Sequence, residues 1–412
     1  MKWEVVTLHH LAPSKGATVS GPFGSNIGSR FFVSEGIPVI RGNNLKMGGN
    51  KFIDEGFVFL TEEKASEFTN CVALTDDIIL TAAGSIGQVG IIPEAARYPK
   101  YIISNKQIRV RIDRSIANPL FVYYWLSSPE MTQFIVNQNN GGAVPLLNLS
   151  IVRKLPVPLP PLPIQNKIAS TISRYDDLIE NNRRRIELLE QAARLLYKEW
   201  FVHFRFPGHE HVKIVDGVPE GWENYVVPDV IEINPKESTQ RGNSIKYIPM
   251  SSLSETGMTI NTEQVEIRES PASVRFRNND VLLARITPCL ENGKTAYVNI
   301  LDKDEVACGS TEFIIMRGKR VSPYFTYCFA RTEELRGHAI NSMIGSSGRQ
   351  RVQVSAFRDY QISIPPRDLL EPFDEFASSC FKQIEILQRE NSQLKKARDL
   401  LLPRLMNGEI AI

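Results

Sequence analysis

The stretch PPLPIQNKIASTISRYDDLIENNRRRIELLEQAARLLYKEW, residues 160–200, decides the fold of this chain. After its two prolines, apolar residues recur at steps that alternate between four and three, which is the spacing of a coiled-coil seam. A second stretch with this spacing follows Pro365-Pro366, about half a chain length later. Proline is tolerated at a helix start, because the first N–H groups have no partner within the helix. We therefore predict two long helices, each beginning at a proline pair.

The positions of the two predicted seams correspond one to one. In the first helix they are Ile168, Ile172, Tyr175, Ile179, Asn182, Ile186, Leu189, Ala193, Leu196 and Trp200. In the second helix they are Phe373, Ala377, Cys380, Ile384, Leu387, Asn391, Leu394, Arg398, Leu401 and Leu405. We expect the helices to pack on each other as an antiparallel coiled coil and to act as a spacer between two globular domains. The alternative is two unrelated amphipathic helices that cover separate cores.

Two asparagines interrupt the apolar seam, Asn182 in the first helix and Asn391 in the second. An antiparallel arrangement with a local two-fold near position 184 brings them together. A buried asparagine pair fixes the register and orientation of a coiled coil at some cost in stability. We therefore predict that this pair locks the orientation of the two helices.

The remainder of each half also repeats, as a mixed α/β domain in an α+β architecture. Asp77-Ile78-Ile79-Leu80 corresponds to Asp280-Val281-Leu282-Leu283, and Pro119–Trp125 to Pro323–Phe329. The predicted domains are residues 1–150 (first globular), 151–205 (first long helix), 206–355 (second globular) and 356–412 (second long helix). Within them we predict strands at 149–153 and 354–358, one helix from Pro119 past Pro129, and a linker at 207–220.

Composition limits the class of protein. The apolar fraction of 42% and the charged fraction of 23% are typical of a soluble globular protein. The N-terminus lacks a signal-peptide core, and five cysteines without a CxxC pair suggest reduced thiols and no metal site, so we expect a cytoplasmic protein. The net charge of +2 excludes a strongly basic nucleic-acid coat. No HExxH or GxxxxGK[ST] motif is present, so we expect no catalysis by this chain.

The segment Leu155–Ile168, with its PLPPLPIQNKI core, resembles the proline-rich entry into the central conserved helix of type I restriction–modification specificity subunits. Further stretches resemble recurring features of that family: Ile40–Asn44, Gly84–Gly87, Gly217–Trp222 and Leu400–Ile410. The second entry, at Pro365-Pro366, lacks the glutamine found at Gln165 in the first. That difference leaves the architecture unaffected.

The resemblance implies a prokaryotic DNA-specificity subunit whose two globular domains are target recognition domains, each reading one half of a bipartite, asymmetric DNA site. It also implies that the coiled coil sets the gap between the half-sites and docks two modification (methyltransferase) subunits. Restriction (translocase/nuclease) subunits would complete the complex, and S-adenosylmethionine, ATP and Mg would be bound by partners. The alternatives are a self-contained modifying enzyme and a coiled-coil adaptor that binds only proteins.

Residues that read bases need hydrogen-bonding groups on loops; Arg or Lys suits guanine, and Asn or Gln suits adenine. In the first domain the candidates are Arg41, Asn43, Asn44, Ser85, Lys106 and Gln107. In the second they are Arg285, Thr287, Asn292, Lys294, Arg349 and Arg351. Gly84, Gly141 and Gly345 would allow the backbone to approach phosphate closely. For each candidate the alternative is an ordinary turn or a solvated strand face.

Overall fold

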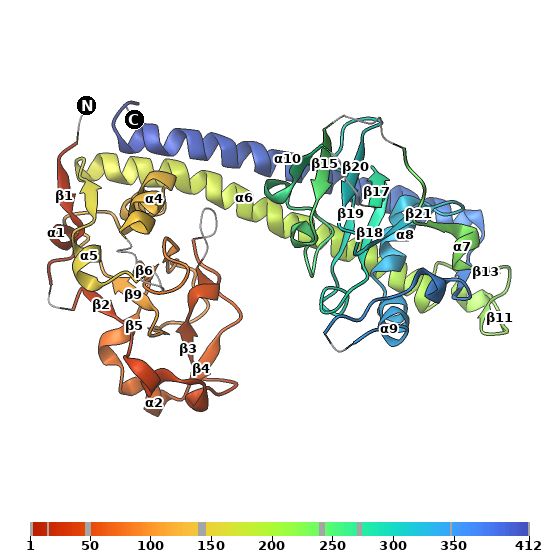
Figure 1. The fold of residues 1–412 in the computed structure, drawn as a ribbon, viewed down its shortest axis with the longest axis horizontal. Coiled ribbons are helices and arrows are strands. Elements are labelled where there is room, and N and C mark those ends of the chain that lie inside the picture. The colour runs from red at the N-terminus through yellow and green to blue at the C-terminus, as the bar shows by residue number, and fades with distance from the viewer. Residues whose placement is uncertain are drawn as a thin grey trace. The chain divides into compact units, whose positions relative to one another are not determined.

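Each half of the chain builds the same pair of four-stranded sheets in the computed structural model (Figure 1). The structure describes residues 3–14, 16–45, 51–138, 146–238, 244–269, 274–346 and 348–410. The chain divides into two units, one of Met1–Glu180 with Asn391–Ile412 and one of Asn181–Glu390. Each unit therefore contains one globular part together with one end of both long helices.

The first unit places one central strand between two cores. Its first sheet has the order β2 (Thr18–Ser20), β9 (Gln107–Val110), β6 (Ile78–Thr81), β7 (Val89–Ile91). Its second sheet has the order β4 (Val58–Leu60), β3 (Ile37–Ile40), β8 (Tyr101–Ile103), β5 (Val72–Ala73). Successive side chains of a strand point to opposite faces, so Ile79 enters one core while Ile78 and Leu80 enter the other. The strand β6 is therefore buried on both faces.

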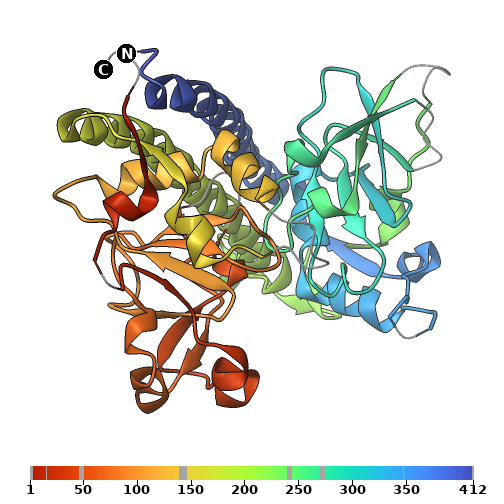
Figure 2. The same cartoon turned by 60° about the vertical axis from the view of Figure 1, so that its left-hand side comes forward.

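The second unit repeats this topology strand for strand, and Figure 2 shows the ribbon turned by 60° from the view of Figure 1. Its first sheet has the order β14 (Ile231–Ile233), β21 (Phe313–Gly318), β18 (Val281–Ala284), β19 (Thr295–Tyr297). Its second sheet has the order β16 (Glu266–Arg268), β15 (Ile245–Ile248), β20 (Val306–Gly309), β17 (Val274–Arg277). The predicted match of Asp77–Leu80 with Asp280–Leu283 is confirmed, because β6 and β18 occupy the same place in their sheets.

Short helices flank the sheets. They are α1 (Leu8–Leu11), α2 (Glu62–Ser66), α3 (Pro119–Leu126), α4 (Pro129–Asn137), α5 (Leu149–Arg153), α7 (Val227–Val230), α8 (Pro323–Ala330) and α9 (Glu333–Asn341). The single helix predicted from Pro119 past Pro129 is wrong, since α3 and α4 are separate. Ser128 has an extended backbone, and its hydroxyl accepts a hydrogen bond from Met131 N at 3.2 Å, which caps a new helix.

The strands predicted at 149–153 and 354–358 are also wrong. The first segment is α5, capped by Asn148 Oδ1, which accepts from Ile151 N at 2.9 Å, and the second contains a 3-10 turn, Val354–Phe357. The strands lie just beyond, where β10 (Pro156–Pro158) pairs with β1 (Val5–Thr7) and β22 (Gln361–Ile364) pairs with β13 (Glu223–Val226). A short apolar run does not distinguish a strand from one buried helical turn.

The segment predicted as a linker, 207–220, carries a small hairpin of β11 (Ile214–Val215) and β12 (Val218–Pro219). Its turn places Asp216 and Gly217 in the left-handed region, with φ of 50° and 84°. Glycine and aspartate tolerate this conformation better than most residues, which explains why the hairpin forms here.

The two long helices are α6 (Leu162–Tyr197), which continues as a π-helical turn to Val202, and α10 (Arg367–Met406). They pack as an antiparallel coiled coil, and no predicted seam residue is exposed. The seam residues also belong to the globular cores. Ile168 and Ile172 join the core of the first unit, whereas Phe373 and Ala377 join that of the second.

The two seam asparagines each bond to the opposite helix. In the second unit, Asn182 Nδ2 donates to Glu390 Oε2 at 3.3 Å. In the first unit, Asn391 Nδ2 donates to the carbonyl oxygen of Ile179 at 3.4 Å. These bonds satisfy amides that the seam takes out of water. The direct pairing of Asn182 with Asn391 stays a prediction.

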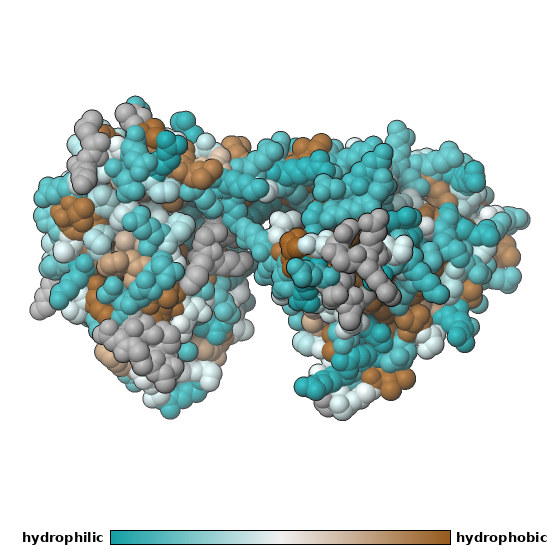
Figure 3. Space-filling model, turned by 45° about the horizontal axis from the view of Figure 1, so that its top comes forward, coloured by the Kyte–Doolittle hydropathy of each residue, from teal (hydrophilic) through white to brown (hydrophobic). Residues whose placement is uncertain are grey.

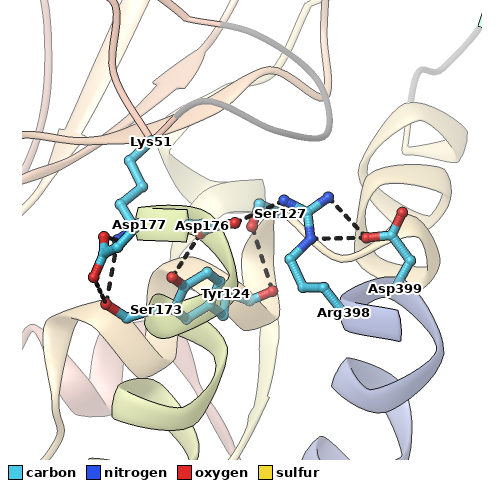
Figure 4. A network of polar contacts seen from close by, with 8 residues as sticks. All are labelled: Lys51, Tyr124, Ser127, Ser173, Asp176, Asp177, Arg398 and Asp399. Atoms are coloured by element: carbon cyan, nitrogen blue, oxygen red, sulfur yellow. Dashed lines mark hydrogen bonds and ion pairs between the residues drawn. The ribbon is translucent and has the colours of Figure 1, made fainter. Parts of the chain in front are cut away.

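A polar network joins the helices of the first unit to its globular part (Figure 4). Asp176 on α6 and Arg398 on α10 form an ion pair at 2.7 Å, and both side chains are 8% exposed. Tyr124 on α3 donates its hydroxyl to the same carboxylate at 2.7 Å. At the edge of the network, Lys51 pairs with Asp177 at 3.2 Å. Asp176 is therefore the point at which α3, α6 and α10 are held together.

The second unit uses a different carboxylate for the same purpose. Glu190 on α6 is buried and accepts from Tyr327 Oη at 2.6 Å and from Met258 N at 2.7 Å. Beside it, Tyr197 and Phe201 pack edge-on or tilted against Phe325 and Phe373. This unit thus relies more on aromatic contacts with the helices.

We expect Arg398→Ala to destabilise the first unit by about 3–5 kcal/mol, because it leaves the Asp176 carboxylate buried without its counter-ion. Urea denaturation followed by circular dichroism measures the loss. Arg389→Ala is the matched control, since Arg389 pairs with Glu385 on the same helix but is 71% exposed, and its loss should be below about 1 kcal/mol. Equal losses for the two variants would contradict the role given to the buried pair.

Candidate nucleic-acid interface

Several loops of the first unit converge at one sheet edge. The strands β3 and β8 are parallel, with Ile40 opposite Ile103, so both strands end at the same edge. Ser104 N donates to Ile40 O at 3.0 Å, which brings the segment after β8 beside the segment 41–44. The loop after β6 joins them, because Ala82 N donates to Lys106 O at 2.7 Å. We call this set of loops the first reading edge.

A fourth segment, residues 21–24, closes the first reading edge. Gly21 N donates to Gln107 O at 2.9 Å, and a Cβ on Gly21 would lie 1.9 Å from Ser104 O. Only glycine fits such a close approach of two backbones. Gly84 has φ of +90°, so the loop after β6 also depends on a left-handed glycine. Gly141 lies outside the described residues.

The predicted base-reading residues of the first unit fall into an exposed group and a buried group. Asn43, Ser85 and Lys106 are exposed, and Arg41 is partly buried. Asn44 and Gln107 are each 1% exposed. Asn44 Oδ1 accepts from Arg41 N at 2.9 Å, and its Nδ2 donates to Ile53 O and Glu55 O at 3.0 and 2.9 Å. The interpretation of Asn44 as a base reader is therefore replaced by a structural one.

Gln107 requires the same correction. In the orientation that satisfies both ends of its amide, the Gln107 nitrogen donates to Ile40 O at 3.2 Å and the oxygen accepts from Gly42 N at 3.2 Å. A buried amide with these bonds holds the loops of the reading edge together. It cannot reach a DNA groove without losing them, and an unpaired buried amide costs about 1–3 kcal/mol.

The second unit has an equivalent set of loops, the second reading edge. Parallel β15 and β20 end together, and Ser310 N donates to Ile248 O at 3.2 Å. The loop after β18 joins them, because Arg285 N donates to Glu312 O at 2.9 Å. Gly345, a predicted phosphate-approach residue, has φ of +133°. The same backbone contacts thus build both edges.

Four of the six predicted residues of the second unit lie in the loop after β18, and the other two, Arg349 and Arg351, lie in the segment after α9 that bridges to this loop at Ile286. Asn292 and Arg349 are exposed, and Arg285, Thr287, Lys294 and Arg351 are partly buried. Several of their polar groups already have partners within the protein. Thr287 Oγ1 accepts from Gln350 N at 3.2 Å, and Lys294 Nζ donates to Met250 O at 3.3 Å. Arg351 pairs with Glu312 at 2.7 Å, and this hydrogen-bonded carboxylate raises the pKa of the guanidinium, which stays charged.

Sequence reasoning missed two arginines beside this edge. Arg331 Nη1 donates to Gly293 O at 2.5 Å, and a Cβ on Gly293 would lie 2.9 Å from Arg336 Nη1. Both follow the loop 285–294 by more than thirty positions in the chain. A helix-start pattern at Thr332 would have predicted α9, but not its proximity to Gly293.

An ion pair supports the central strand behind each edge. Asp77, just before β6, accepts from Arg111 Nε and Nη2 at 2.8 and 2.6 Å. Asp280, just before β18, accepts from Arg317 Nε and Nη2 at 2.6 Å each. Burial raises the pKa of Asp280, and the adjacent Arg317 guanidinium opposes that rise. These pairs hold the neighbouring strands of each sheet in register.

In the described ranges, no three His, Cys, Asp or Glu side chains gather in an arrangement that would hold a metal ion. The helices in the described part of the chain include none that is both long and apolar enough to cross a membrane. Figure 3 shows a face on which hydrophilic residues dominate and apolar residues form separate patches in each unit.

We expect Gly21→Ala to disrupt the first reading edge, because the added methyl group collides with Ser104 O. The variant should lower the thermal midpoint of the first unit, and proteolysis should increase near residues 21 and 104. Gly28→Ala provides the control, since its Cβ would meet Ser25 O at an ordinary 3.5 Å. An unchanged melting curve for Gly21→Ala would show that the loops shift to accommodate the methyl group without loss of thermal stability.

Comparison with known proteins places this architecture in a family. The model of the type I restriction modification DNA specificity domain matches residues 2–191 and 219–396. The specificity subunit of type I restriction enzyme MjaIX from Methanocaldococcus jannaschii is 26% identical over 376 residues, covering 88% of this chain and 84% of the relative. That of HindI from Haemophilus influenzae is 23% identical over 390 residues, covering 75% and 81%.

A solved structure supports the fold alone. The crystal structure of a type I restriction-modification system S subunit from M. genitalium is 14% identical, with a TM-score of 0.56 over 98% of this chain and 96% of that one. The family match covers most of the chain in two successive regions, in agreement with the repeated topology of the two units. The chain therefore belongs to the type I restriction-modification specificity family, whose function is the recognition of DNA sequence.

Proposed function

We propose that this chain is the non-catalytic DNA-reading subunit of a type I restriction–modification complex. Each unit reads one half of a bipartite, asymmetric DNA site through its reading edge. Two modification subunits dock on the coiled coil and methylate adenine, and restriction subunits supply ATP-dependent cleavage. S-adenosylmethionine, ATP and Mg belong to these partners. The cytoplasm of a prokaryotic cell is the expected location.

One observation carries the proposal: the same reading edge occurs twice, with different side chains at its tips. The first edge exposes Asn43, Ser85 and Lys106, whereas the second exposes Asn292 and Arg349. Base identity is read by hydrogen-bonding side chains in the grooves, so different tips on one scaffold favour different half-sites. Two different half-sites make the complete target asymmetric.

The dimensions of the long helices support the spacer role. With 36 residues at 1.5 Å per residue, α6 is about 54 Å long. Two sites read from one face of a DNA duplex lie about one turn apart, on the order of 34 Å. One helix is therefore long enough to contribute to both units across such a gap. The buried side chains of the seam favour a rigid connection over a flexible linker.

Methylome sequencing of cells that express the neighbouring modification gene, with and without this chain, tests the proposal. We expect a split, asymmetric motif of methylated adenines that depends on the chain. Replacing residues 1–150 with the matching domain of a relative should change one half of that motif and leave the other unchanged. If an active modification subunit gave no chain-dependent methylation, the protein-only adaptor would become the better hypothesis.

A groove on the helices of the second unit is a candidate docking site for a modification subunit. It has a volume of about 370 Å³, and its lining residues are Arg185, Leu188, Leu189, Ala192, Phe376, Ser379, Cys380 and Gln383. Leu188 and Phe376 are 64% and 42% exposed although both are large and apolar. Buried apolar anchors commonly dominate the energy of protein interfaces.

We expect Leu188→Glu to weaken assembly with the modification subunit at least ten-fold, because a carboxylate would be buried in the interface. Size-exclusion chromatography and titration calorimetry of the purified subunits measure the effect. Ile267→Glu is a matched control, since Ile267 is 65% exposed in the same unit but lies on β16. Equal affinity of the two variants would place the docking surface elsewhere.

A further inference from the structure

The two reading edges differ in charge at several equivalent positions. Lys106 O accepts from Ala82 N in the first unit, as Glu312 O accepts from Arg285 N in the second. The β-bridge of Leu146 with Ala83 likewise corresponds to that of Arg351 with Ile286. A lysine and a leucine in the first unit thus take the places of a glutamate and an arginine in the second.

Backbone hydrogen bonds and β-bridges hold the segment that carries Arg351 of the Glu312–Arg351 pair. Arg351 forms antiparallel bridges with both Ile286 and Ile344, and it exchanges two backbone hydrogen bonds of 3.0 Å with Ile344. The neighbouring bond from Thr287 N to Gln350 O, at 3.1 Å, anchors the preceding residue. Side chains that read DNA need such support, because small displacements lose the geometry of the contact.

The carboxylate occupies only one side of the guanidinium. Arg351 Nε donates to both Glu312 oxygens at 3.0 Å, and Nη2 donates to Oε1 at 2.7 Å. Nη1 donates to Arg349 O at 3.3 Å. Of the five N–H groups of arginine, this leaves one on each terminal nitrogen. The Arg351 side chain is 40% exposed, so part of it is open to a ligand.

The first unit offers different chemistry at the same place. Lys106 is exposed, and no hydrogen bond or ion pair joins its side chain to another residue in the described ranges. Leu146 is 60% exposed. An ammonium group beside an aliphatic chain suits a phosphate or a thymine methyl group, but it does not form the two parallel N–H bonds of a guanidinium.

We propose that Arg351 reads one guanine of the second half-site through its two remaining N–H groups, and that Glu312 is the positioning residue that orients it. Guanine presents O6 and N7 to the major groove, and two parallel donors match this pair of acceptors. Because the first unit has Lys106 and Leu146 at these positions, this glutamate-oriented arginine contact is confined to one half of the site. This inference rests on the proposed function, since it assumes that the reading edges face DNA.

Methylome sequencing of Arg351→Ala and Glu312→Gln, each expressed with the modification subunit, tests the assignment. Both variants should accept other base pairs at the same single G·C position of one half-site, and the other half should stay unchanged. Arg268→Ala is the control. Arg268 also pairs with a glutamate, but it lies on β16 beside Ile245, at the end of β15 that is far from the reading edge. Competition binding to duplexes with that one base pair replaced should show discrimination reduced about ten-fold or more.

The outcomes separate the two proposals. If the wild-type chain directs no methylation, the proposed function fails and this inference fails with it. If the wild type yields a motif that Arg351→Ala leaves unchanged, only the guanine assignment is overturned. If Arg351→Ala abolishes methylation, the variant Arg351→Lys is tested instead, because it keeps the charge and loses the paired donors. Relaxed specificity at one G·C position in that variant supports the assignment. An unchanged motif overturns it.

Discussion

The burial of the seam between α6 and α10 is the constraint on which the rest of the structure depends. The helices are part of both globular cores, because each core contains seam residues from both of them. In the first unit Ile168 and Leu405 share a core with the sheet, and in the second Ala193 and Phe373 do so. Each globular part therefore buries apolar side chains against the helix ends of its own unit.

Duplication repeated the scaffold but not every polar contact. The Asp77–Arg111 and Asp280–Arg317 pairs occupy the same place behind the central strands. The contacts between globular part and helices differ, with an Asp–Arg–Tyr cluster in one unit and Glu190 with aromatic rings in the other. A sheet register tolerates few alternatives, whereas a helix surface can be held by different polar partners.

Each reading edge combines a backbone scaffold that is the same in both units with exposed side chains that differ between them. Parallel strand ends, close backbone contacts and buried amides such as Asn44 and Gln107 hold the loops in position. The exposed side chains above them change without disturbing that support. This separation of rigid scaffold and variable loop is how many binding proteins alter specificity while keeping their fold.

The sequence by itself determined the long helices, the seam and the duplication, because apolar periodicity is a local pattern that burial enforces directly. It also placed most of its candidate residues in loops, since Gly, Asn and Arg mark exposed turns. Only the tertiary structure decided which loop residues face solvent. Asn44 and Gln107 are indistinguishable in sequence from exposed readers, and Arg336 was not predicted at the edge. Their roles follow from the register of strands far apart in the chain, and such long-range pairing produces no local sequence pattern from which it could be predicted.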